Sequence, residues 1–115
     1  MFKSPEALID TTNTLLTEAQ ATDKETQAQI ILKARTNFPN IFKKTNKNSP
    51  FIGKVSQLCC LFVRCVTPNL DYFLKDPEKA KQICETLKIF LQVNIISDSI
   101  AQDLSSLIIS FSFND

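Results

Sequence analysis

Hydrophobic residues recur at spacings of three and four along most of the chain, with polar residues between them. This is the pattern of helices that bury one face against a core. Five segments carry it: residues 5–20, 24–38, 51–66, 77–91 and 98–111. The pattern predicts an all-α fold of about five helices in one domain spanning residues 1–115.

Local signals mark where these helices start and stop. Residues 4–6 (Ser-Pro-Glu) and 76–78 (Asp-Pro-Glu) each offer a capping side chain, a proline at the first helical position and an acidic residue in the first turn. Asp23, and Ser97 or Asp98, are the expected caps of the second and fifth helices. Proline cannot donate a backbone hydrogen bond, so Pro39 should break or kink the second helix and Pro68 should end the third.

Two all-α architectures fit this pattern. The Ser-Pro pairs at 4–5 and 49–50 lie about one helical hairpin apart, which is compatible with stacked HEAT-like helical hairpins. A compact five-helix bundle explains the same spacing. In the fourth helix, the residues expected to point inward are Ala80, Ile83, Cys84, Leu87 and Leu91.

The composition argues against catalysis. The chain of 115 residues contains no histidine and a single glycine, Gly53, so it lacks an imidazole base and a glycine-rich phosphate loop. The cysteines lack the paired spacing of a zinc site, and we interpret them as reduced core residues: Cys59, Cys60, Cys65 and Cys84. We therefore expect no enzyme activity, no metal, no cofactor and no small-molecule substrate.

Charge is unevenly distributed, although the net charge is only +1. No acidic residue lies between Glu25 and Asp71. The candidate basic patch in this interval comprises Lys33, Arg35, Lys43, Lys44, Lys47 and Lys54. Such a patch could bind nucleic acid or an anionic membrane, or its lysines could simply face water.

The segment from 58 to 63 is the candidate apolar core or interface. Its apolar members cover much of the helix circumference: Leu58, Leu61, Phe62 and Val63. If neighbouring helices leave part of it uncovered, that part would bind a partner; otherwise it belongs to the core. A helical scaffold that binds another protein subunit is therefore the leading hypothesis.

Three segments occur in an order that resembles a known family. They are residues 41–44 (Ile-Phe-Lys-Lys), 55–62 (Val-Ser-Gln-Leu-Cys-Cys-Leu-Phe) and 83–89 (Ile-Cys-Glu-Thr-Leu-Lys-Ile). In this order they resemble the C-terminal helical hairpins of the large α-solenoid subunit of retromer. The resemblance implies a HEAT-like end that docks a phosphoesterase-fold subunit and takes part in endosomal cargo sorting. It implies no binding residue that can be placed on this chain.

The expected location is intracellular. The chain begins with a polar segment and contains no run of 18 apolar residues, so neither a signal peptide nor a membrane span is predicted. The cytoplasm is the default compartment, and the retromer resemblance implies a peripheral position on endosomal membranes.

Overall fold

The computed structural model describes residues 4–46, 48–93 and 98–112; for residues 98 and 99 it describes the backbone but not the side chains. All regular elements in these residues are helices, so the predicted all-α class is confirmed. Five of them are 12 to 17 residues long: α1 (Pro5–Ala19), α2 (Lys24–Arg35), α4 (Ile52–Val66), α6 (Pro77–Val93) and α7 (Asp98–Ser112). The shorter elements are α3 (Phe38–Lys44), the 3-10 turn η1 (Thr67–Asn69) and α5 (Leu70–Leu74).

Two prolines interrupt the helices, but not quite as expected. The predicted second helix is divided into α2 and α3, and Pro39 lies in the first turn of α3, where its missing N–H is not needed. Likewise, α4 ends at Val66, and Pro68 opens a 3-10 turn that leads into α5. The sequence pattern had predicted no helix between residues 66 and 77.

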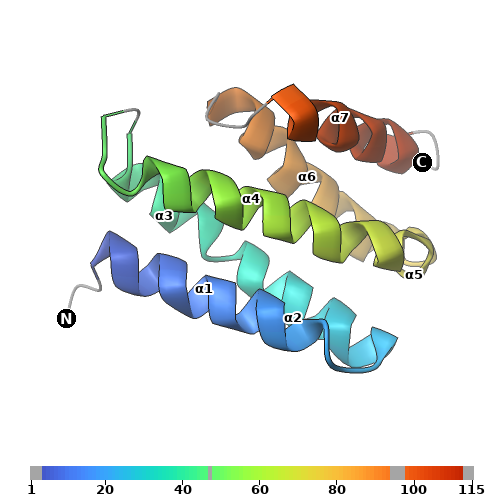
Figure 1. Ribbon diagram of the computed structural model, residues 1–115. Coiled ribbons are helices and arrows are strands. Elements are labelled where there is room, and N and C mark those ends of the chain that lie inside the picture. Colours follow the sequence, from blue (N-terminus) through green and yellow to red (C-terminus); the bar gives the residue numbers. More distant parts are fainter. Residues whose placement is uncertain (1–3, 47, 94–97, 113–115) are drawn as a thin grey trace.

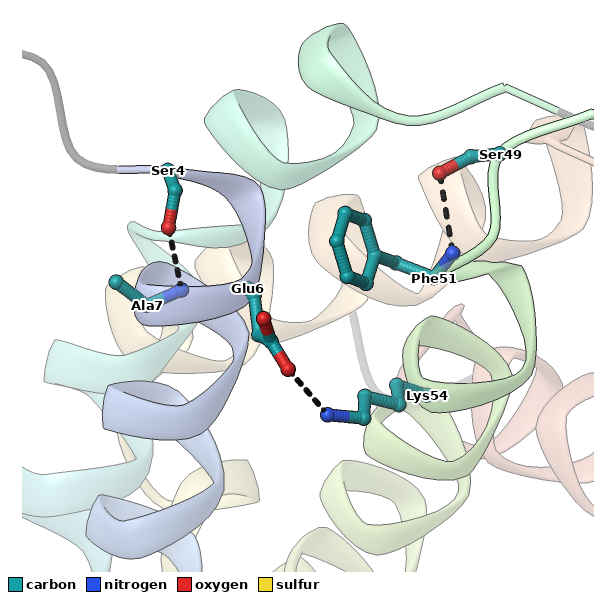
Figure 2. Close-up of polar contacts among 6 residues, drawn as sticks. All are labelled: Ser4, Glu6, Ala7, Ser49, Phe51 and Lys54. Carbon is teal, nitrogen blue, oxygen red and sulfur yellow. Dashed lines mark hydrogen bonds and ion pairs between the residues drawn. The ribbon is translucent and has the colours of Figure 1, made fainter.

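Side-chain caps fix the starts of α1, α2 and α6. The Ser4 hydroxyl accepts a hydrogen bond from the Ala7 N–H at 3.1 Å (Figure 2). Asp23 Oδ1 accepts one from the Thr26 N–H at 2.7 Å, and Asp76 Oδ1 accepts one from Glu78. Each bond satisfies a backbone donor that the helix itself leaves free. The expected caps of α7, Ser97 and the Asp98 side chain, lie outside the described residues.

The Ser-Pro pair at 49–50 works differently from the pair at 4–5. The Ser49 hydroxyl accepts a hydrogen bond from the Phe51 N–H at 3.2 Å (Figure 2), and Ile52 N–H bonds the Ser49 carbonyl. These bonds form a turn ahead of α4, whose first residue is Ile52 rather than the expected Phe51. The two pairs are therefore not structurally equivalent.

The helices form two layers. Figure 1 shows α1, α4 and α7 side by side at the front, with α2, α3 and α6 behind them. The chain returns to the front layer twice: α1 with α2 makes one hairpin, α6 with α7 makes a second, and α4 lies between them. This order has features of both predicted architectures, because the hairpins are stacked and still enclose one core.

Three phenylalanine rings occupy the space between the layers. Phe38, Phe62 and Phe90 come from α3, α4 and α6, and all three are fully buried. Their ring centroids lie 4.8 to 5.5 Å apart, within the favoured range for aromatic pairs. The rings connect the two layers where the helix backbones do not approach closely.

The outer helices present polar surfaces. The exposed positions of α1 carry threonine, asparagine, aspartate and glutamate with one alanine, and those of α7 carry serine, glutamine and aspartate with one isoleucine. Among the described helices, none has the length and apolar content needed to cross a bilayer.

Candidate interaction surfaces

The apolar segment of α4 belongs mainly to the core. Leu58 is 1% exposed, and Phe62 and Val63 are equally well covered. Leu61 is half-buried and packs against the same core from its edge. Of the four apolar residues named for this segment, the structure therefore assigns Leu58, Phe62 and Val63 to the core and leaves Leu61 at its border.

Four residues of the candidate basic patch lie at helix ends. Lys33 and Arg35 are in the last turn of α2, and Lys43 and Lys44 are in the last turn of α3. Positive side chains at these positions favourably oppose the negative end of the helix dipole. Because Lys33 and Arg35 are two residues apart on a helix, they point to different sides of α2.

Lys54 is paired with an acidic residue from a distant part of the chain. Its Nζ lies 2.8 Å from Oε1 of Glu6 on α1 (Figure 2). The hydrogen bond and charge of Glu6, and more weakly the charge of Asp10, raise the pKa of Lys54. Helix α1 thus supplies negative charge next to the segment between Glu25 and Asp71, which contains no acidic residue of its own. Lys47 lies outside the described residues.

Arg35 differs from the lysines because it is half-buried. Its Nε atom is buried and has no hydrogen-bond partner among the described residues. A buried donor without a partner is unfavourable, and an anion is the natural acceptor for a guanidinium.

The four cysteines are free thiols. Cys59, Cys65 and Cys84 are buried, and Cys60 is half-buried. Burial raises the pKa of the Cys59 and Cys65 thiols, and the Cys65 thiol donates a hydrogen bond to the Leu16 carbonyl. In the part of the chain that the structure describes, no three metal-ligating side chains cluster.

A groove runs along the outside of α6 next to the end of α7. Its volume is about 420 Å³. Ala80 and Cys84 of α6 and Phe111 of α7 provide apolar lining, and Ser112 lies at the end of α7. The charged residues that border it are Glu78, Lys81, Glu85 and Lys88. The groove therefore combines apolar and charged side chains in about equal measure, so a partner that fills it must offer both apolar contacts and charges.

Two large apolar side chains are exposed on the same pair of helices. Leu91 is 44% exposed and Ile109 is 53% exposed, and no other large hydrophobic in the described residues is comparably open. Leu91 follows Cys84 by two helical turns, so it lies on the groove side of α6. The inward position predicted for Leu91 is wrong, because the helices packed against α6 do not cover this part of its final turns.

The α6–α7 surface, defined as the groove together with Leu91 and Ile109, had not been identified from the sequence. The periodicity of α6 places Leu91 near the edge of its apolar stripe, but it does not say how far a neighbouring helix extends.

No known protein family matches the chain, and no curated protein or solved structure matches it either.

Proposed function

We propose that this chain is a non-catalytic helical module that binds another protein subunit through the α6–α7 surface. The observation that carries the proposal is the coincidence of a groove with exposed apolar side chains on the same two helices. The outer face of α1, by contrast, is polar. Large exposed apolar patches mark binding sites, so the proposal requires one partner to cover Leu91, Ile109 and the groove together.

The physical basis is burial of apolar area. A partner that covers Leu91 and Ile109 removes their side chains from water, at roughly 25 cal/mol for each Å² of apolar surface. The charged border of the groove can select the partner, because charge complementarity adds specificity and association rate.

Affinity capture with matched variants tests the proposal. The bait variant Leu91→Gln/Ile109→Gln removes the apolar contacts with a residue that favours helices. Thr14→Gln on the exposed face of α1 is the control. We expect the same protein to be recovered with the wild-type chain and with the control, but lost with the double variant. Equal recovery with all three baits, or no specific protein with any, contradicts the proposal.

The retromer resemblance suggests a more specific role for such a module. We propose that the bound subunit belongs to an endosomal cargo-sorting coat, with the stacked hairpins serving as a scaffold. The support is the order of the three matching segments and their positions on α3, α4 and α6. Co-localisation of the tagged chain with endosomal coat proteins tests this role, and a diffuse distribution that ignores endosomes contradicts it.

The alternative is that the basic residues bind nucleic acid or an anionic membrane. Its specific support is Arg35, whose buried Nε has no partner among the residues described. Binding of this kind weakens steeply with salt. Undetectable binding to both nucleic acid and anionic vesicles at low salt removes this alternative, as does binding that Arg35→Gln leaves unchanged.

A further inference from the structure

Four exposed charged residues of alternating sign follow one face of α6. They are Glu78, Lys81, Glu85 and Lys88. Spacings of three and four place them along one side of the helix. None of them takes part in an ion pair within the described residues, where the pairs are Glu6–Lys54 and Asp76–Lys79.

The order of these charges is self-complementary. Glu78 and Lys88 lie five residues before and after Ile83, and Lys81 and Glu85 lie two residues before and after it. Reversing the direction of the helix therefore exchanges every Glu position with a Lys position.

We propose that α6 binds α6 of a second copy of this chain, antiparallel, with the twofold axis crossing the charged face at the level of Ile83, whose own side chain is buried on the opposite side of the helix. Glu78 then faces Lys88 of the second copy, and Lys81 faces Glu85. Because the twofold axis repeats each contact, the interface contains both pairs twice. This inference rests on the proposed function, since it names the partner that occupies part of the α6–α7 surface.

The antiparallel direction follows from charge. A parallel pair in register would place Glu78 against Glu78 and Lys81 against Lys81, which is repulsive. The charges from 78 to 88 span about 15 Å of helix at 1.5 Å per residue, so one straight stretch of α6 carries them all.

The competing explanation is that the charges only stabilise α6 itself. Spacings of three and four do allow pairs within a single helix. That explanation predicts that replacing the charges changes helix stability and leaves the association state unaffected. One experiment can therefore distinguish the two explanations.

Sedimentation velocity with two matched variants is that experiment. The acidic variant is Lys81→Glu/Lys88→Glu, and the basic variant is Glu78→Lys/Glu85→Lys. The wild-type sedimentation coefficient should rise with concentration at low salt. Each variant alone should associate at least about tenfold more weakly, because every pair in the interface becomes repulsive. An equimolar mixture of the two should restore association.

A fourth protein serves as the control for effects of the substitutions other than charge pairing. The quadruple variant exchanges all four charges and keeps the self-complementary order, so it should associate like the wild type. Circular dichroism melting confirms that each variant is folded, since exposed positions tolerate substitution well.

Three outcomes overturn the inference: a wild-type chain that remains monomeric at every concentration, association that both charge variants leave unchanged, or a mixture that fails to associate. A monomeric wild-type chain whose affinity capture still depends on Leu91 would overturn the self-association and leave the proposed function standing. If capture fails as well, both are overturned.

Discussion

Replacing Phe62 by alanine removes the central ring of the core. Phe62 is fully buried on α4 and contacts the rings of Phe38 and Phe90, with centroids 5.2 and 5.5 Å away. Both contacts are edge-on, with interplanar angles of 75° and 72°. The substitution therefore removes the ring contacts between α4 and the two helices of the other layer, α3 and α6.

The expected loss of stability is large. Buried phenylalanine to alanine substitutions cost about 3–5 kcal/mol, including the cavity they leave. The two aromatic pairs, worth roughly 0.5–1.5 kcal/mol each, place this site towards the upper end. A domain of this size is stable by about 5–15 kcal/mol, so the variant should lose a third or more of that free energy.

Urea unfolding measures this loss directly. The midpoint should fall while the slope of the transition stays constant. Phe42→Ala is the control, because Phe42 is half-buried at the edge of the cluster and should lose clearly less. A loss below about 1.5 kcal/mol for Phe62→Ala, outside the range for a buried ring, would refute the placement of this residue at the centre of the core.

Three further predictions follow from burial and hydrogen bonding. Leu58→Asp buries an unpaired carboxylate and should destabilise the fold by several kcal/mol, on the order of the cost of an unsatisfied buried charge; wild-type melting would contradict its burial. Alkylation of the native protein should modify Cys60 first and Cys59 last, as read by mass spectrometry of the peptides; equally rapid modification of all four thiols would contradict the structure. The hydrogen bonds from Thr26 lower the pKa of Asp23 below its ordinary value of 3.8, so its contribution to stability is present above that pH and is lost as the pH falls through the lower folded pKa. Asp23→Ala should abolish this part of the acid dependence in melts between neutral pH and pH 2, and an unchanged pH profile would show that the cap contributes nothing.

The helices were predictable because their signals are local. Apolar spacing, the caps at Ser4 and Asp23, and the break near Pro39 all depend on residues within a few positions of one another. Helix α5 was missed because it has only five residues and no distinct cap, so its apolar residues resemble a connection.

The interaction surfaces depend on tertiary arrangement instead. The Glu6–Lys54 ion pair joins residues 48 positions apart, so a stretch that is basic in sequence acquires an acidic neighbour in space. The exposure of Leu91 depends on where α7 lies relative to α6, and periodicity carries no information on that distance. The charges of α6 are visible in the sequence, but their lack of partners within the described residues is a structural observation.

Amide hydrogen exchange tests most directly the claim that this chain acts by binding protein through the α6–α7 surface. The measurement compares the chain alone, at low concentration, with the chain bound to a captured partner or to a second copy. We expect slower exchange in α6 and α7 on binding, with α1 and α2 unchanged. Protection that appears on α1 and α2 instead, or no change in α6 and α7, would contradict the account.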